Sequence, residues 1–246
     1  MSYNSFAYLY DALNQAADYN RLFQELSGIF RRNGIADGIL ADLGCGTGEM
    51  ALRFAKAGYT VLAVDSSVDM LSVFQDKLSE GSPKDILLLQ QDLARLDFYG
   101  TVQGAYSTFD TLNHLPQSKL EKALARISLF LEPGGLFIFD ANTPYKHAGI
   151  LADNEFCIED GYGGVCIWKN TYDAAQNPPA TRIDLRFTQN GEEAGTESFW
   201  EYAYPLHYWQ AALKRHGFSL LEVCDGERFT ALSADSPRFL FTARKQ

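Results

Sequence analysis

The chain has 246 residues, of which 46% are hydrophobic and 21% are charged, and its formal net charge at pH 7 is −10. This length and composition predict a soluble globular protein that forms one large domain, or one domain with an inserted lobe. The acidic balance and the scattered Lys and Arg residues argue against a nucleic-acid partner, because phosphate backbones are bound by clustered cations.

Membrane and secretory signals are not apparent in the sequence. It has no apolar run of about eighteen residues, and its first residues do not show a basic region followed by an apolar one. We therefore predict a cytoplasmic protein with no membrane partner. The four cysteines have neither metal-site spacing nor a disulfide pattern, and we expect reduced thiols at Cys45, Cys157, Cys166 and Cys224.

The N-terminal region, residues 3–34, is expected to be helical. Its apolar residues follow a helical stripe, Asp18 is a plausible N-cap, and Gly34 ends the pattern. The segment ahead of Asp18 is rich in aromatic residues, including Tyr8 and Tyr10. These aromatic side chains either pack on a sheet or form a lid over a ligand.

A glycine-rich loop follows the first predicted strand, residues 39–43. The sequence D-L-G-C-G-T-G has the spacing G-x-G-x-G and leads into a helix over residues 47–57. Glycine allows the left-handed backbone that such a tight reversal needs and lets a ligand approach the main chain. The spacing differs from the G-x-G-x-x-G that binds the pyrophosphate of a dinucleotide.

Asp42 stands two residues ahead of the first glycine of this loop. A carboxylate there would repel a diphosphate, so the loop is suited to a ligand with a positive end. The alternative is an ordinary tight turn with no ligand.

An acidic residue also ends the second predicted strand, residues 60–65. Asp65 lies about twenty residues after the first glycine, where doubly wound folds place the carboxylate that accepts from a ribose hydroxyl. Its two oxygens match the two donors of a cis-diol. Helix capping is the alternative, although Ser66 and Ser67 are available for that role.

A helix over residues 68–80 and a third strand over residues 85–90 lead to Asp92. An acid at the carboxyl end of a parallel strand lies in the crevice where such sheets bind ligands. Asp92 is therefore expected to accept from an exocyclic amine such as that of adenine, unless it is only an exposed loop acid.

The middle of the chain continues the alternation of strand and helix. A fourth strand over residues 102–109 precedes the most regular helical pattern, residues 116–131, and a Pro-Gly-Gly turn then leads into a fifth strand over residues 136–140. This order implies right-handed crossovers and a parallel sheet.

From about residue 145 the sequence becomes rich in short β-patterns. Four stretches are separated by Gly, Asn and Pro turns, and a helix over residues 205–216 is followed by two more strands. We predict a doubly wound α/β fold, with a mostly parallel seven-stranded sheet, an antiparallel last strand, a small antiparallel β insert and N-terminal helices. The expected division is residues 1–144 and 205–246 for the main domain, 1–34 for its N-terminal cap, and 145–204 for an inserted lobe that covers the substrate.

The residues resemble the class I, Rossmann-like S-adenosylmethionine-dependent methyltransferases. The resemblance rests on D-L-G-C-G-T-G, V-D-S-S-x-D-M-L, Q-D-L and L-E-P-G-G-L-F-I-F-D, which lie at residues 42–48, 64–71, 91–93 and 131–140. It covers residues 36–142 strongly and 205–244 weakly.

This resemblance implies S-adenosylmethionine as cofactor and S-adenosylhomocysteine as product. By the resemblance, the glycine loop holds the methionine part, Asp42 lies near its amino group, Asp65 holds the ribose diol, and Met70 packs on adenine. Asp92 and the N–H of Leu93 read the adenine edge. The residues expected to bind the cofactor are Asp42, Gly44, Cys45, Gly46, Gly48, Asp65, Ser66, Met70, Asp92, Leu93, Phe109 and Tyr10.

The acceptor side of the expected site is less defined. A sheet insert after the fifth strand resembles small-molecule N-methyltransferases, including aminosugar dimethyltransferases, in which it covers the acceptor. His114 is the candidate general base because it follows the fourth strand, with a capping or packing role as the alternative. Tyr8 and Tyr10 are candidates for cation–π contact with the sulfonium, and His207 and Tyr208 for contact with the acceptor.

Missing motifs narrow the function to methyl transfer onto a nitrogen or oxygen of a small molecule. The fourth strand ends in S-T-F-D, without the Asn/Asp-Pro-Pro-aromatic motif that resembles base or glutamine-amino methylation and without the Pro-Cys that a covalent cytosine mechanism needs. Asp110 and Asp140 do not have clustered ligand spacing, so no metal is predicted. The alternatives are a non-catalytic module that binds the cofactor and an NAD-dependent oxidoreductase. The protein is expected to be a monomer or homodimer.

Overall fold

The computed structural model describes residues 7, 10–11, 14, 17–78, 83, 85–159 and 163–246. Two sheets organise these residues, a large one of seven strands and a separate one of four. In the described ranges, no helix is long and apolar enough to cross a membrane.

The seven-stranded sheet has the order β10-β11-β5-β4-β1-β2-β3. Strands β5, β4, β1, β2 and β3 pair in parallel, and β11 pairs antiparallel with both β5 and β10. The predicted seven-stranded fold with an antiparallel last strand is therefore confirmed. The strands are β1 (Gly38–Leu43), β2 (Tyr59–Asp65), β3 (Ile86–Gln90), β4 (Val102–Ser107), β5 (Leu131–Asn142), β10 (Phe218–Asp225) and β11 (Arg238–Lys245).

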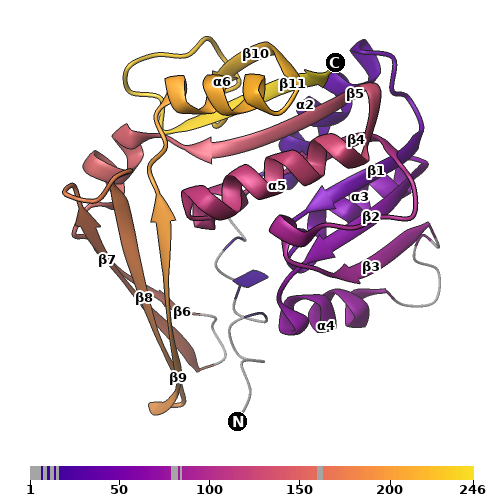
Figure 1. Ribbon diagram of the computed structural model, residues 1–246. Coiled ribbons are helices and arrows are strands. Elements are labelled where there is room, and N and C mark those ends of the chain that lie inside the picture. Colours follow the sequence, from indigo (N-terminus) through magenta and orange to yellow (C-terminus); the bar gives the residue numbers. More distant parts are fainter. Residues whose placement is uncertain are drawn as a thin grey trace.

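Helices cover both faces of this sheet, as expected for parallel strands joined by crossovers. One buried cluster joins α5 and α6 to one face, and a second joins α2 and α3 to the other. Figure 1 shows α5 crossing in front of the sheet and α6 beside β10 and β11. The helices are α2 (Tyr19–Arg32), α3 (Glu49–Lys56), α4 (Val68–Lys77), α5 (Gln117–Phe130) and α6 (Leu206–Arg215), with short turns η1 (Leu93–Arg95), η2 (Thr111–His114) and η3 (Lys146–Leu151).

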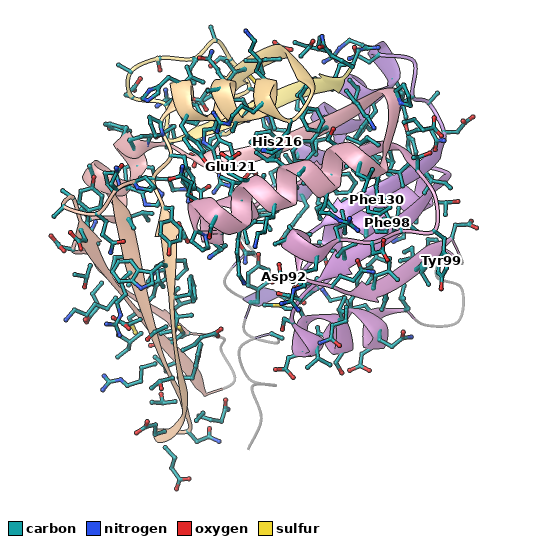
Figure 2. The ribbon with its side chains drawn as sticks, viewed as in Figure 1. Asp92, Phe98, Tyr99, Glu121, Phe130 and His216 are labelled. Carbon is teal, nitrogen blue, oxygen red and sulfur yellow. The ribbon has the colours of Figure 1, made fainter. Side chains whose placement is uncertain are left out.

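Helices α5 and α6 are also joined by a polar cluster around Glu121. Its carboxylate accepts from the Tyr208 hydroxyl at 2.8 Å and from Arg215 Nη2 at 2.5 Å. The Nε2 atom of His216 lies 2.7 Å from the second Glu121 oxygen, and Figure 2 shows these two side chains together between the helices. This cluster fixes the helix that follows the insert against the parallel sheet.

The predicted N-cap of helix α2 is confirmed, because Asp18 accepts from the Arg21 N–H and the helix begins at Tyr19; the helix predicted ahead of Asp18 falls mostly outside the described residues. Two other predicted boundaries were wrong for identifiable physical reasons. Helix α3 begins at Glu49, since Gly48 has a φ of 86° that no helix allows. Strand β5 already starts at Leu131, the last residue of the predicted helix, by pairing with Val102, and it includes the predicted Pro-Gly-Gly turn.

The four-stranded sheet lies between β5 and α6 in the chain and is antiparallel throughout. Figure 1 shows its long strands standing apart from the parallel sheet, beyond the end toward which β5 points. Alternate residues of β8 and β9 share a face by register, and Glu197, Phe199 and Glu201 lie on the face of Leu185. The strands are β6 (Glu155–Glu159), β7 (Gly164–Asp173), β8 (Ala180–Gln189) and β9 (Glu192–Tyr202).

Candidate functional site

The glycine loop joins β1 to α3 with all three glycines in the left-handed region. Their φ angles are 79° at Gly44, 52° at Gly46 and 86° at Gly48. A Cβ at Gly44 or Gly48 would lie 2.3 Å from a neighbouring side chain, so packing requires both glycines. Among the described residues, a Cβ at Gly46 would meet only Tyr10, at 3.8 Å, so these residues leave the backbone at Gly46 open to a ligand.

The Asp65 carboxylate at the end of β2 lies directly beside this loop. One oxygen accepts from the Gly46 N–H at 2.9 Å, and the other accepts from the Ser67 N–H at 2.8 Å. The N-cap of α4 is Ser67, whose hydroxyl accepts from Met70 N. Burial raises the pKa of Asp65, and backbone N–H donors partly oppose that shift. Asp65 is thus not the helix cap, and each oxygen retains capacity for a second donor.

A cavity of about 380 Å³ opens in front of Gly46 and Asp65. Its size is that of a site for a small cofactor. Ten of the residues predicted from the sequence line it, which brings residues from β2, α4, η1 and the β4–η2 turn to one place. They are Tyr10, Gly44, Gly46, Asp65, Ser66, Met70, Asp92, Leu93, Phe109 and His114.

A smaller cavity of about 30 Å³ continues past Gly46 and is lined by Asp42 and Cys45. Asp42 is buried and accepts from the Tyr106 hydroxyl at 3.0 Å. Burial raises its pKa to about 7, against the lowering effect of the Tyr106 hydrogen bond. A cationic group entering this cavity would offset that burial and favour the carboxylate. The residues here therefore fit a ligand with a positive end.

Asp92 is engaged more fully than a simple loop acid. It caps η1 by accepting from the Ala94 N–H at 2.9 Å, and its other oxygen accepts from Lys119 Nζ at 3.1 Å. Although burial raises its pKa, these two donors lower it overall. Figure 2 shows Asp92 at the lower edge of the parallel sheet, near α4.

The turn after β4 differs most from the sequence-based expectation. The predicted strand to residue 109 was wrong, because Phe109 and Asp110 both have positive φ angles, 57° and 52°. The Asp140 carboxylate accepts from the backbone N–H groups of both residues, at 2.8 and 2.6 Å. Arg238 donates to Asp140 at 2.9 Å and to Asp110 at 2.7 Å. Such backbone costs about 1–3 kcal/mol per residue and is typical of functional sites.

A further cavity of about 220 Å³ lies on the insert side of this turn. Four residues line both this cavity and the 380 Å³ cavity, namely Tyr10, Phe109, His114 and Phe199. The remaining lining comes from the end of β5, the insert and β11, and includes Asp110, Asn142, Lys146, Trp168, Glu201 and Arg238.

His114 stands between the two cavities, at the end of η2. Its ring centroid lies 5.1 Å from that of Phe199 on the insert. Although the imidazole is exposed to the cavities, the protein around it lowers its pKa by desolvation, against Asp110, Asp65 and Glu197. The lowered pKa favours the neutral imidazole, which can accept a proton or a hydrogen bond.

The remaining aromatic and histidine candidates differ in whether they reach the two cavities. Tyr10 lines both cavities, whereas Tyr8 lies outside the described residues. Neither His207 nor Tyr208 lines these two cavities, and Tyr208 instead stacks on Tyr204 and donates to Glu121. Gly48 supports the loop through its contact with Phe74.

Two acids of the insert were missed in the sequence. Glu197 lines the 380 Å³ cavity and Glu201 the 220 Å³ cavity, with Phe199 between them on the same face of β9. The sequence signal for these two acids was the alternation of acid, aromatic and acid on β9, the strand that comes after the regularly alternating β8. It could not be used without knowing which face of the insert is covered.

Comparisons with known proteins identify the family of the chain. A family model described as a methyltransferase domain matches residues 40–135. The putative methyltransferase YqeM of Bacillus subtilis (strain 168) is 30% identical, over 100% of this chain and 98% of its own length. The putative methyltransferase GWCH70_2453 of Geobacillus sp. (strain WCH70) is 32% identical over 100% of both chains.

Solved structures extend the comparison. A crystal structure of an S-adenosylmethionine-dependent methyltransferase from Clostridium acetobutylicum ATCC 824 has a TM-score of 0.84 and 26% identity, covering 99% of this chain and 98% of its own. CalS10, an amino pentose methyltransferase from Micromonospora echinaspora with S-adenosylmethionine bound, has a TM-score of 0.74 and 17% identity, covering 100% and 98% of the two chains, and at that identity shares the fold. With the full-length relatives at 30% and 32% identity, these findings identify the chain as a member of the class I S-adenosylmethionine-dependent methyltransferase family and as an enzyme with that cofactor.

Proposed function

We propose that the protein methylates a nitrogen or oxygen atom of a small molecule, with the methyl donor in the 380 Å³ cavity and the acceptor in the 220 Å³ cavity. The observation that carries this proposal is the common wall of the two cavities, formed by Tyr10, Phe109, His114 and Phe199. Because the same four residues line both cavities, the cavities adjoin, and a donor in one can face an acceptor in the other for in-line displacement.

The donor site is assigned to the residues that surround Gly46. Asp65 accepts from the ribose diol with its two remaining acceptor positions, and Met70 and Leu93 line the same cavity on the adenine side. The small cavity with Asp42 and Cys45 receives the methionine part, whose ammonium group favours the ionised Asp42 carboxylate. Asp92 and its neighbour Leu93 bind the edge of the adenine ring.

The bound cofactor supplies a sulfonium methyl group that is already activated for transfer. The chain therefore has to orient the acceptor and exclude water. Positioning of this kind lowers the activation barrier by about 7–11 kcal/mol. The turn at Phe109 and Asp110, held by Asp140, fixes one wall of this arrangement. The neutral His114 imidazole accepts a proton from acceptors that need a base, and otherwise packs against Phe199.

The division of the chain follows from the same proposal. Residues 1–144 and 205–246 form the cofactor domain, and residues 145–204 form the lobe that covers the acceptor through Phe199 and Glu201. Proteins of similar structure, among them the sugar N-methyltransferase KedS8, support a small-molecule acceptor. Location in the cytoplasm and a monomeric or homodimeric state stay predictions.

Calorimetry with S-adenosylmethionine, S-adenosylhomocysteine and NAD tests the donor assignment. We expect both adenosyl compounds to bind and NAD to give no heat. Preference for NAD would overturn the proposal, and so would normal cofactor binding with no methyl transfer to any member of a broad amine and alcohol panel.

A further inference from the structure

We propose that the acceptor is an amine whose nitrogen binds to Glu201, Asn142 and His114 in the 220 Å³ cavity. This inference rests on the proposed function and names the substrate class for its acceptor site.

The geometric basis is a convergence of polar atoms from three parts of the chain. One side-chain nitrogen or oxygen atom of each of Asp110, His114 and Glu201 lies within 4.8 Å of the others. Residues 110 and 114 come from the η2 turn, whereas Glu201 comes from β9 of the insert. All three line the cavity that also contains Asn142.

Asn142 supplies an independent observation. It is only 2% exposed, and its Oδ1 atom has no hydrogen-bond partner among the described residues. Its Nδ2 atom donates to Glu201 Oε2 at 3.1 Å, so the amide is held beside the carboxylate with its acceptor unused. Leaving a buried acceptor unpaired costs about 1–3 kcal/mol, which a ligand that brings a donor would remove.

The groups in this cluster define what the ligand must provide. An ammonium group beside Glu201 offsets its burial and favours the carboxylate. In that state the Glu201 carboxylate and the Asn142 amide oxygen only accept, and a neutral His114 imidazole offers one acceptor nitrogen. A hydroxyl group brings one donor, whereas an ammonium group brings three and a neutral primary amine two. The cluster of Glu201, Asn142 and His114 is therefore better matched by an amine than by an alcohol.

Cations already present in the cavity distinguish an amine from a metal ion. Arg238 donates to both Asp110 and Asp140, and Lys146 lies 3.4 Å from Glu227, so the hydrogen bonds and ion pairs of both cations are directed to acids other than Glu201. A divalent ion would have to bind within the field of these two positive side chains. A singly charged or neutral amine is opposed much less.

The other walls suit the organic part of such a molecule. Phe199, Leu185 and Trp168 line the cavity, and the Trp168 N–H is already bound to Asn170 Oδ1 at 2.6 Å. Its ring therefore presents an apolar surface, over which an ammonium group gains cation–π attraction. These apolar side chains do not require hydrogen-bond donors on the rest of the acceptor molecule.

Glu201 also provides a place for the proton that an amine must lose. Burial first, and the nearby Asp110 second, raise the pKa of Glu201 to about 8. One proton passes from the ammonium group to the Glu201 carboxylate, and this frees the nitrogen lone pair. The nitrogen then bonds to the methyl carbon, the carbon–sulfur pair remains on sulfur, and the positive charge passes to the methylated nitrogen.

The test compares matched amines and alcohols on protein saturated with S-adenosylhomocysteine. Calorimetry with cyclohexylamine against cyclohexanol, and with glucosamine against glucose, measures the preference for the amine. We expect at least one amine to bind about tenfold or more tightly than its alcohol, the scale of a charged hydrogen bond. Glu201→Gln is expected to remove this preference and leave the affinity for S-adenosylhomocysteine unchanged.

Glu193→Gln is the matched control, because Glu193 is an exposed acid on the same strand β9. It is expected to retain the full amine preference. Thermal melting of both variants checks folding, and the wild-type comparison of amine with alcohol stands even where Glu201→Gln does not fold.

Three results would overturn the inference. These are equal binding of amine and alcohol in both pairs, an unchanged preference in folded Glu201→Gln, and tight binding of Mg²⁺ or Mn²⁺ that disappears in that variant. Failure of the proposed function is a different result, because the protein would then show no heat with S-adenosylhomocysteine itself.

Discussion

Replacement of Asp65 by Asn tests the centre of the donor site. In the wild type each carboxylate oxygen accepts from one backbone N–H, that of Gly46 at 2.9 Å and that of Ser67 at 2.8 Å. Asparagine keeps one acceptor and turns an amide NH₂ group toward the other N–H, so one of these bonds is lost together with the negative charge. A charged hydrogen bond is worth about 1.5–3 kcal/mol, which corresponds to about a ten- to hundredfold loss of affinity for S-adenosylmethionine.

Isothermal titration of S-adenosylmethionine into wild type and Asp65→Asn measures this loss directly. Asp85→Asn is the control, since Asp85 is an exposed acid just ahead of β3, at the opposite end of the parallel strands. Circular dichroism and melting of the free proteins separate a fold defect from a binding defect. The same dissociation constant for Asp65→Asn and wild type would refute the assignment of Asp65 to the ribose diol.

Three further changes test other parts of the molecule. Glu121→Gln should lower the free energy of unfolding by about 1–3 kcal/mol at pH 7, and the difference from wild type, followed by urea unfolding, should shrink toward acid. The donors around Glu121 outweigh burial and lower its pKa from 4.5 to about 2. Its contribution to the free energy of unfolding is therefore present above pH 4.5 and is lost as the pH falls through about 2. An equal stability difference between variant and wild type at pH 7 and pH 3 would contradict this. Gly48→Ala places a Cβ 2.3 Å from Phe74 at a φ of 86°, and should destabilise by about 2 kcal/mol or more in the same assay, so wild-type stability would rule out this packing. His114→Asn should reduce turnover by about 10²–10⁴-fold with unchanged S-adenosylmethionine affinity if His114 is the base, and full activity would leave it a packing role.

Much of the parallel sheet could be predicted because local patterns and global fold agree there. The apolar stripe of α5 and the buried runs of β1 and β2 each identify one element without reference to distant residues. The antiparallel pairing of β10 with β11 also followed from their order in the chain. The insert was harder to interpret, because period-2 alternation defines two faces of a sheet and does not say which one is covered.

The two halves of the site differ in the same way. Donor-side residues follow consecutive strand ends of one sheet, so Gly46, Asp65 and Asp92 could be placed together from the topology alone. The residues of the proposed acceptor cavity come from the turn after β4, β5, the insert and β11, and Asn142 and Glu201 are brought together only by tertiary packing. No spacing in the sequence encodes that contact.

The turn at Phe109 and Asp110 shows why such contacts also change local structure. A sequence window containing S-T-F-D favours continuation of the strand, since aromatic and β-branched residues suit a pleated backbone. Asp140 binds both N–H groups of the turn, and Arg238, almost a hundred residues later, neutralises the two acids that would otherwise repel each other. The last strand of the sheet thus stabilises the strained backbone that lines both the 380 Å³ and the 220 Å³ cavity. For this reason Arg238 belongs to the site through the acids it holds, although it lies far from the motifs of the donor loop.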